Sequence, residues 1–141
     1  MQKEVLNMIT NTEQKTATVA VIYNNQILLL KRGDTAPWMP GKYCLPGGGV
    51  EENESLDHAA SRELYEETKI VIPTKLMTSM EVNSRDKKKI VFVAYVNSKN
   101  VVLNFEHSDY VWASIKDIAK YKLVPELSTT ILTLIHYHHL K

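Results

Sequence analysis

The fold of this chain is decided by the stretch 47-GGGVEENESLDHAASRELYEETKI-70, in which three glycines precede a long segment without breakers. Residues 54–68 contain no glycine or proline, and Leu56, Ala60 and Leu64 recur at the i, i+4, i+8 spacing of one helical stripe. The pattern predicts a helix over residues 54–68.

The start of this helix is signalled by two residues. Asn53 belongs to the residue types favoured as an N-cap. Glu54 would lie in the first turn, where a negative charge meets the positive end of the helix dipole. The glycines Gly47 to Gly49 permit backbone conformations closed to other residues, so we expect a turn between the short strand before them and this helix.

Three carboxylates gather on one face of the predicted helix. Glu63, Glu66 and Glu67 stand at i, i+3 and i+4 and therefore occupy adjoining positions. Like charges at this spacing destabilise an isolated helix by about 0.2–0.5 kcal/mol per pair unless a cation compensates. Oxygen ligands without histidine or thiolate favour Mg²⁺ or Mn²⁺, and Mg²⁺ commonly keeps waters and substrate phosphates as ligands. The pattern indicates a hard divalent cation and a phosphate-bearing substrate.

Two further features bear on this interpretation. Arg62 precedes Glu63 directly and Glu66 by four residues, so its guanidinium can hold a carboxylate bidentately and fix the geometry of the cluster. The glycine turn offers backbone carbonyls as neutral metal ligands beside the helix. The simpler alternative also stays open, since glutamates on a helix most often form a solvated face.

The whole segment resembles the Nudix box, G-x5-E-x7-R-E-U-x-E-E-x-G-U, where U is an aliphatic residue. Lys69 stands where the box has its last glycine, so we expect the tight left-handed cap of the helix to be replaced by an arrangement costlier for a side chain. The chain supplies eight of the nine fixed positions, namely Gly48, Glu54, Arg62, Glu63, Leu64, Glu66, Glu67 and Ile70.

The resemblance implies an α/β fold, a Nudix-type α/β/α sandwich with a mixed central sheet. It also implies Mg²⁺-dependent hydrolysis, in which water attacks phosphorus in the pyrophosphate linkage of a nucleoside-diphosphate-linked substrate, such as a nucleoside triphosphate. The alternative is a non-catalytic module that binds a nucleotide for regulation, for which Lys69 is the only indication in the motif. A third hypothesis is an isomerase on the same scaffold, which would make Cys44 essential.

Roles for individual residues follow from the same resemblance. Arg62 and Glu54 would orient the ligands of Mg²⁺, with Mn²⁺ as the alternative cation. The catalytic base would be Glu63 or an acid outside the box, where we rank Glu106 ahead of Asp109. The metal ligands would be the Gly47 carbonyl and the carboxylates of Glu63, Glu66 and Glu67.

Residues outside the helix are candidates for contact with the substrate. Arg32 and its neighbour Lys31 end a predicted strand and would meet a phosphate there, although ordinary surface placement is equally compatible. Trp38, Tyr43 and Tyr23 could stack on a nucleobase, but packing in the core or at the lip of a site is the more common role of such residues and is favoured for each. The predicted substrate contacts are Arg32, Tyr43 and Gly48.

Cysteine and histidine have simpler interpretations in this sequence. Cys44 is the only cysteine, which excludes an intrachain disulfide, and its strand-like neighbours favour a buried apolar residue over a nucleophile. His136, His138 and His139 look like a metal cluster. They nevertheless end the predicted last helix, where protonated histidine complements the negative end of the dipole.

The rest of the chain alternates predicted strands and helices. Apolar and β-branched residues over 16–23 and 26–30, separated by Asn24 and Asn25, predict an opening β-hairpin. Further strands are predicted over 43–45, 70–82, 89–96 and 101–115, a loop over 33–42, and an amphipathic helix over 126–140 with Pro125 in its first turn.

Composition narrows the class of protein. The hydrophobic fraction is 44% and the charged fraction 23%, which is typical of a globular protein. A formal net charge of +1 favours neither a membrane nor a nucleic-acid partner, so we expect a small-molecule nucleotide substrate, with a capped RNA end as the one exception.

A single domain over residues 1–141 is expected, as a monomer or homodimer. Residues 1–10 lack the apolar core of a signal peptide, which favours a cytoplasmic location.

Overall fold

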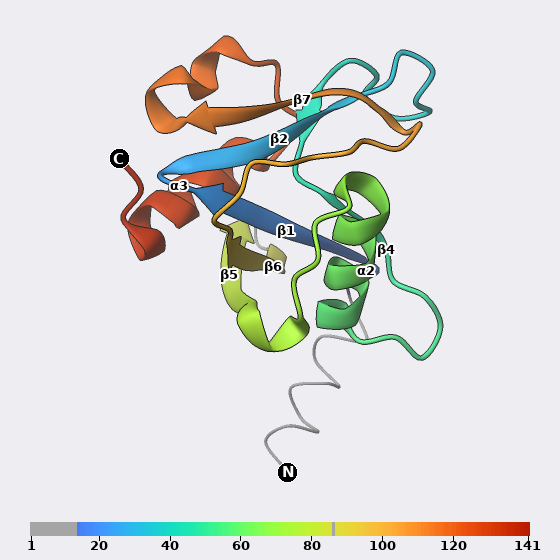
Figure 1. The fold of residues 1–141 in the computed structure, drawn as a ribbon. Coiled ribbons are helices and arrows are strands. Elements are labelled where there is room, and N and C mark those ends of the chain that lie inside the picture. Colours follow the sequence, from blue (N-terminus) through green and yellow to red (C-terminus); the bar gives the residue numbers. More distant parts are fainter. Residues whose placement is uncertain (1–13, 86) are drawn as a thin grey trace.

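The computed structural model describes residues 14–85 and 87–141, in which one mixed sheet lies between two helices (Figure 1). The strands are β1 (Thr16–Tyr23), β2 (Gln26–Arg32), β3 (Tyr43–Cys44), β4 (Gly47–Gly49), β5 (Thr78–Ser84), β6 (Lys87–Tyr95) and β7 (His107–Ser114). The helices are α2 (Leu56–Thr68) and α3 (Leu127–His138), and two 3-10 segments are η1 (Thr74–Leu76) and η2 (Ile115–Lys120).

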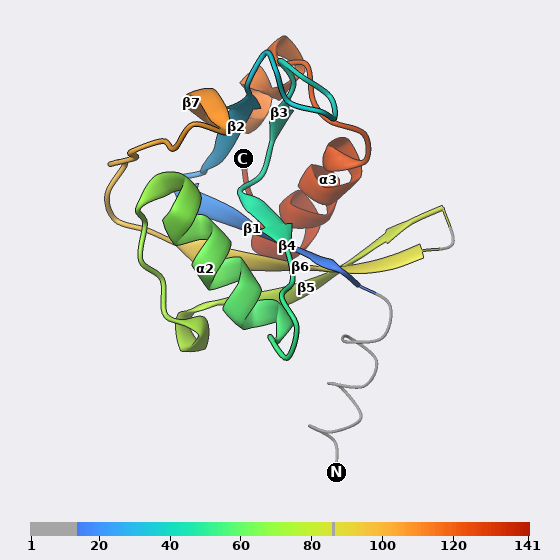
Figure 2. The ribbon, with the colours of Figure 1, turned by 90° about the vertical axis from the view of Figure 1, so that its right-hand side faces the viewer.

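The α/β/α sandwich predicted from the sequence is confirmed. Figure 2 shows α2 and α3 on opposite sides of β1, β5 and β6. The strand order is β3-β2-β1-β6-β5, with β4 added to β1 and β7 added to β2. The sheet is mixed because β1 runs parallel to β6 and antiparallel to β2 and β4.

Alternating side chains divide the apolar residues of the sheet between two cores. On β1, Ala20 and Ile22 belong to one core, whereas Val19 and Val21 belong to the other, because successive strand residues face opposite sides. Both faces are covered, which explains why β1 and β2 read as continuous apolar runs. The first core is closed by Leu127, Ile131 and Leu134 of α3. The second is closed by Leu56, Ala59, Ala60 and Leu64 of α2.

The opening hairpin is confirmed, but its two strands separate after the turn. They pair at Ile22 with Ile27 and at Tyr23 with Gln26. Beyond this point β2 pairs with β7 and β1 with β6. Residues 43–49, which we call the bridging segment, pair with β2 through β3 and with β1 through β4. The bridging segment therefore spans the opening between the two separating strands.

The three glycines were predicted to form a turn, and that prediction was wrong. Gly47, Gly48 and Gly49 form β4, whose residues lie opposite Thr18, Ala17 and Thr16 of β1. The reason is that the β1 backbone at this end is free of β2 and accepts the bridging segment as its antiparallel neighbour.

The start of α2 also differs from the prediction. The N-cap is Ser55, and Asn53 instead adopts a positive φ of 63° two residues earlier. Asparagine tolerates this left-handed conformation better than most residues, so it serves the turn before the helix. Glu54 therefore precedes the helix, and the acid in the first turn is Asp57.

The end of α2 keeps the left-handed cap that we expected Lys69 to abolish. Lys69 has φ 65° and ψ 10°, and its backbone N–H donates to the Tyr65 carbonyl at 2.8 Å. Its ammonium lies 4.8 Å from the centre of the Tyr65 ring. The cap is thus formed by a lysine in a conformation that glycine would adopt at lower energy.

Three other predicted elements begin earlier in the sequence than the observed ones. Residues 70–73 are not strand, since Pro73 lacks an N–H and η1 follows it, and β5 begins only at Thr78. Residues 101–106 precede β7 as a loop, in which the Asn104 side chain accepts a hydrogen bond from the Glu106 N–H. The last helix begins at Leu127 because Glu126 has a positive φ of 71°.

No helix among the described residues is long and apolar enough to cross a membrane. The prediction made for residues 1–10 lies outside the described residues.

Candidate active site

A cleft of about 1120 Å³ opens beside the bridging segment. One group of its lining residues comes from β4 and the strands next to it, and includes Gly47, Gly48, Cys44 and His107. Another comes from the β5–β6 hairpin and the start of α3, and includes Lys89 and Glu126. The cleft therefore joins the glycine strand to a second wall of charged side chains.

Arg62 is the centre of an ionic network on α2. Its Nε and Nη2 atoms donate to the two carboxylate oxygens of Glu54 at 2.8 and 2.9 Å, which is a bidentate pair. Its Nη1 atom donates to Glu63 at 2.9 Å and to Glu66 at 3.3 Å, and its Nη2 atom donates to the Gly49 carbonyl at 2.9 Å. One guanidinium thus ties the acidic helix to the end of β4.

The ionic network lowers the pKa of Glu54 and raises the pKa of Arg62. The hydrogen bonds from Arg62 lower the pKa of Glu54 to about 2, so Glu54 is ionised throughout the neutral range. The hydrogen bonds that Arg62 donates to Glu54 and Glu63 raise the pKa of Arg62 further above its already high value. The pair is therefore a fixed salt bridge that holds the loop before α2 against the helix.

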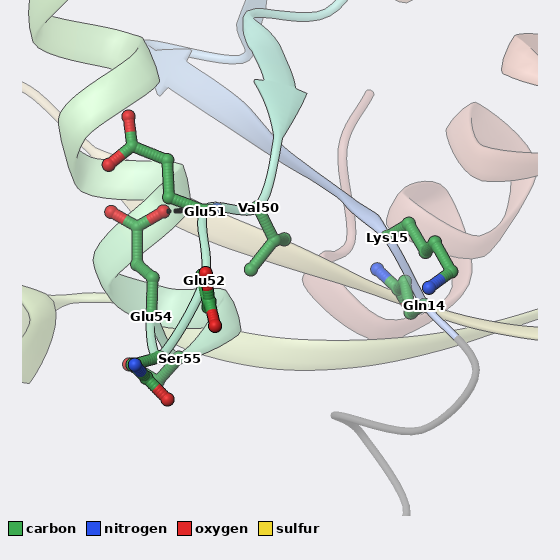
Figure 3. A pocket seen from close by; sticks show the side chains of 8 residues that line it. Gln14, Lys15, Val50, Glu51, Glu52, Glu54 and Ser55 are labelled. Atoms are coloured by element: carbon green, nitrogen blue, oxygen red, sulfur yellow. Dashed lines mark hydrogen bonds between the residues drawn. The ribbon is translucent and has the colours of Figure 1, made fainter.

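Figure 3 shows this loop from close by. A second pocket is lined by Gln14 and Lys15 on one side and by residues 50–55 on the other. The Glu54 carboxylate accepts a hydrogen bond from the Glu51 N–H at 3.0 Å, drawn as a dashed line, and both side chains lie next to α2. Glu54 is thus occupied with the loop and with Arg62, as expected for a supporting residue.

Glu67 is the most unusual acid in the structure. It is only 2% exposed, because it continues the buried stripe of α2 three residues after Leu64. One of its oxygens accepts a hydrogen bond from the Gly47 N–H at 2.9 Å. Burial, reinforced by the charges of Glu63 and Glu106, raises the pKa of Glu67 to about 8.

A side chain at either of the first two positions of β4 would meet neighbouring atoms, but of different kinds. A Cβ atom at Gly47 would collide with the backbone of Ala17 and Thr18 on β1. A Cβ atom at Gly48 would lie 2.5 Å from the carboxyl carbon of Glu63. Gly48 therefore leaves room for the Glu63 carboxylate beside the strand, whereas no atom within 4 Å opposes a Cβ at Gly49.

Glu63 and Glu106 lie close enough for their charges to interact. Burial raises the pKa of Glu63 even though Arg62 acts in the opposite direction, and the charges of Glu66 and Glu106 add to the increase. Glu106 also contributes to the raised pKa of Glu67. The charge of Asp109 is not among the causes that raise the pKa of Glu63 or Glu67. It raises the pKa of Tyr43 instead.

The three predicted carboxylate ligands are near one another but do not form a ready-made cage. Within residues 14–85 and 87–141, no three histidine, cysteine or acidic side chains are grouped closely enough to hold an ion. Glu63 and Glu66 turn toward Arg62, Glu67 turns toward Gly47, and the side chain of Glu66 is 50% exposed.

The predicted substrate contacts differ in their positions. Gly48 and Arg32 line the cleft. Tyr43 is not among the residues that line it; its ring packs edge-on against Tyr121 at 5.0 Å, beside the α3 core. Tyr23 likewise packs against Trp112. Of the three aromatic residues considered from the sequence, Trp38 is the one that lines the cleft.

Cys44 is buried, as the sequence indicated. Its Sγ atom lies 3.5 Å from the Leu30 carbonyl oxygen and 3.7 Å from Nε2 of His107. Burial raises the pKa of the thiol to about 11, and burial together with the charge of Arg32 lowers the pKa of His107 to about 4. Both groups are neutral at pH 7, which speaks against a thiolate nucleophile.

The terminal histidines are not grouped as metal ligands in the described residues. His138 Nδ1 lies 2.7 Å from the Tyr95 hydroxyl, and His136 packs against Tyr137. Lys87, Lys88 and Lys89 also line the cleft and were not among the candidates from the sequence. Lys87 and Lys88 fall between the predicted strands 70–82 and 89–96, and Lys89 begins the second of them. The run of three lysines was the available signal.

The fold and the acidic helix beside a glycine strand define the class of protein. A family model described as NUDIX domain matches residues 13–134. The chain belongs to this family and is a Nudix hydrolase.

Its relatives include two bacterial proteins named nucleoside triphosphatase NudI. The protein from Escherichia fergusonii is 27% identical, and the match covers 78% of this chain and 89% of that protein. The protein from an Escherichia coli strain is 28% identical over the same shares of the two chains.

Solved structures agree with this assignment. The MutT protein from Methanosarcina mazei is 27% identical with a TM-score of 0.67, and the match covers 89% of this chain and 94% of that one. The NUDIX domain of Shewanella oneidensis NrtR, complexed with ADP ribose, has a TM-score of 0.71 at 21% identity, covering 96% and 97% of the two chains. At that identity the likeness concerns the fold alone.

Proposed function

We propose that this chain hydrolyses a pyrophosphate linkage in a nucleoside-diphosphate-linked substrate, with Mg²⁺ as its cofactor. The observation that carries the proposal is the Glu67 carboxylate, buried in α2 behind a cleft-lining glycine and beside Glu63. A buried carboxyl with a pKa near 8 is a group whose charged form needs a cation.

The donor chemistry of the site fits Mg²⁺, with Mn²⁺ as the alternative. Carboxylates and a backbone carbonyl are the oxygen ligands that these ions take, and Mg²⁺ needs only a few of them because waters and phosphates complete its octahedron. When bound, the ion neutralises charge on the phosphoryl oxygens and makes water a better nucleophile. The proposed ligands are the Gly47 carbonyl, Glu63, Glu66 and Glu67.

The other residues of the site hold and orient these ligands. Arg62 is held by its hydrogen bonds to Glu54, and it in turn donates hydrogen bonds to the carboxylates of Glu63 and Glu66. The Gly47 N–H fixes one oxygen of Glu67. These contacts reduce the reorganisation that substrate binding requires, which is the usual means by which such sites accelerate reactions.

A carboxylate would accept the proton of the attacking water. Glu63 and Glu106 are the two candidates, and the influence of the Glu106 charge on Glu63 and Glu67 supports Glu106 over Asp109. We expect Glu106→Gln to lower kcat and Asp109→Asn to leave kcat unchanged, as measured with the best substrate at saturating concentration. Equal losses in the two variants would contradict this ranking.

The names of two relatives support nucleoside triphosphates as the substrate class. Two of them are named nucleoside triphosphatases, so nucleoside triphosphates are the first compounds to test. The direct experiment incubates the purified protein with ribo- and deoxyribonucleoside triphosphates, ADP-ribose and a dinucleoside tetraphosphate, with Mg²⁺ or Mn²⁺, and identifies both products by chromatography. If the phosphoanhydride bonds of all these compounds remain intact, the proposed reaction is refuted.

The metal assignment has its own test. Glu67→Gln preserves the shape of the side chain and removes its charge, so turnover should fall by about 100-fold or more. The matched control is Glu81→Gln, on β5, where the acid forms an exposed ion pair with Lys88. Turnover unchanged in Glu67→Gln would refute the metal site.

The alternative, a non-catalytic nucleotide-binding module, rested only on the departure from the motif at Lys69, and the structure gives that departure no effect on the helix. Lys69 departs from the family motif, yet the left-handed end of α2 is retained and the acidic residues before it keep their positions on the helix.

A further inference from the structure

The cleft extends from β4, the glycine strand beside α2, to the loop of residues 33–42. Trp38 lies in this loop, lines the cleft, and has 51% of its surface exposed. Leaving a large indole in contact with water forgoes the stabilisation that its burial would give. Its position in a cleft beside a proposed phosphate site therefore calls for an explanation in terms of a ligand.

The indole is held in place by Arg32. The Arg32 Nε atom donates to the Trp38 carbonyl at 2.6 Å, and the guanidinium carbon lies over the indole, 5.3 Å from the ring centre. Arg32 ends β2, which is paired with β7 along its length. A cation over the ring thus fixes an aromatic side chain to a rigid strand.

The loop around Trp38 is also tied down at its base. The Arg32 N–H donates to the Lys42 carbonyl at 2.9 Å, and the Gly41 N–H donates to the Arg32 carbonyl at 2.9 Å. The Gly33 N–H donates to the Glu106 carbonyl at 3.1 Å. An aromatic ring that is already ordered loses little conformational entropy when a planar ligand stacks on it.

We infer that Trp38 is the platform on which the nucleobase of the substrate stacks, and that Arg32 positions Trp38 rather than contacting phosphate. The inference rests on the proposed function, because it requires a substrate that carries a base. It assigns the selection of nucleotides over simple polyphosphates to the loop of residues 33–42, and bond cleavage to α2 and β4.

Tryptophan fluorescence tests this directly, since the chain has two tryptophans. Trp112 packs against Tyr23 and donates from Nε1 to the Lys99 carbonyl, and it is not among the residues that line the cleft. Titration with α,β-methylene nucleoside triphosphates in the presence of Mg²⁺ should quench the wild-type protein. The quenching should disappear in Trp38→Phe, which retains only Trp112. Quenching that persists in this variant, or none in the wild type, would overturn the inference.

Binding measured by calorimetry separates the base from the phosphates. Trp38→Ala should raise the Kd of the methylene nucleotide by roughly 5- to 100-fold and leave the Kd of inorganic tripolyphosphate unchanged. Tyr137→Ala is the matched control, because Tyr137 is an exposed aromatic on α3 that does not line the cleft. An unchanged nucleotide Kd in Trp38→Ala, or a loss as large in Tyr137→Ala, would overturn the inference.

Arg32→Lys tests the positioning role. The substitution keeps the charge but removes the Nε donor, so KM for the nucleotide should rise while kcat and tripolyphosphate binding stay as in the wild type. A matching loss of tripolyphosphate affinity would show that Arg32 contacts phosphate and would overturn this part. Failure of the inference and failure of the proposed function can be told apart. Quenching by the nucleotide without hydrolysis refutes the proposed reaction alone, and hydrolysis with an unaltered Trp38→Ala Kd refutes the stacking role of Trp38 alone.

Discussion

At the end of α2, Lys69 occupies a left-handed conformation that costs a side chain about 1–2 kcal/mol relative to glycine. Lys69→Gly should therefore increase the free energy of unfolding by about 1 kcal/mol and raise Tm by a few degrees. Thermal unfolding followed by circular dichroism measures the change. The control is Lys75→Gly in η1, where the same substitution should give no stabilisation, so an equal increase in both variants would contradict the explanation.

Individual site residues were predictable to the extent that they share a helix. The spacing of Arg62, Glu63 and Glu66 indicated that the guanidinium would meet a carboxylate, and both contacts are present. The bidentate pair with Glu54 and the bond from Gly47 to Glu67 were not predictable. Both depend on how the chain before α2 returns to the helix, which no local periodicity encodes.

At the scale of the elements, β4 lies so close to the Glu63 carboxylate of α2 that a side chain at position 48 would displace it. In Gly48→Ala the new methyl group would displace the Glu63 carboxylate. A displacement of about 1 Å in such a site lowers turnover by roughly 100-fold. We expect this loss with little change in secondary structure, measured as kcat/KM for the best substrate and by circular dichroism.

Gly49→Ala provides the matched control, because its Cβ would meet no atom within 4 Å and its φ is not positive. Its activity should remain within about twofold of the wild type. Similar losses in both variants would show that the Gly48 effect is not due to Glu63.

Element types were easier to predict than element ends. The apolar stripe of α2 and the hairpin turn at Asn24 and Asn25 follow from local spacing, and both are confirmed. The helix starts were missed because Asn53 and Glu126 adopt positive φ values, which the sequence does not reveal for residues other than glycine. Pairing of β4 with β1 is a long-range contact and was mistaken for a turn.

For the whole molecule, the buried acid links stability to pH. The pKa of Glu67 is raised from its ordinary 4.5 to about 8 in the folded protein, so its favourable contribution is complete below pH 4.5 and is lost as pH rises through 8. Over this upper range Glu54 and His107 change little, since their pKa values, near 2 and near 4, lie well below it. Cys44, whose pKa is raised from 9.0 to about 11, adds to the loss only as pH approaches 9. The metal-free protein should lose a few degrees of Tm between pH 7 and pH 9.

Magnesium should reverse this loss, because a cation favours the charged form of Glu67. The stabilisation by Mg²⁺ should therefore grow from pH 6 to pH 9, as measured by thermal denaturation with and without a chelator. Glu67→Gln should flatten the dependence. A slope that persists in this variant would assign the pH effect to another group.

The bridging segment has a consequence for how the family can vary. Residues 43–49 are held in register by β2 at one end and by β1 at the other, so one inserted residue would move Gly48 away from Glu63 and redirect every alternate side chain. The loop of residues 33–42 carries no such double constraint. If that loop contacts the base, as we propose, ligand preference can change through its length or composition, while the proposed hydrolytic site tolerates almost no change in the length of the bridging segment.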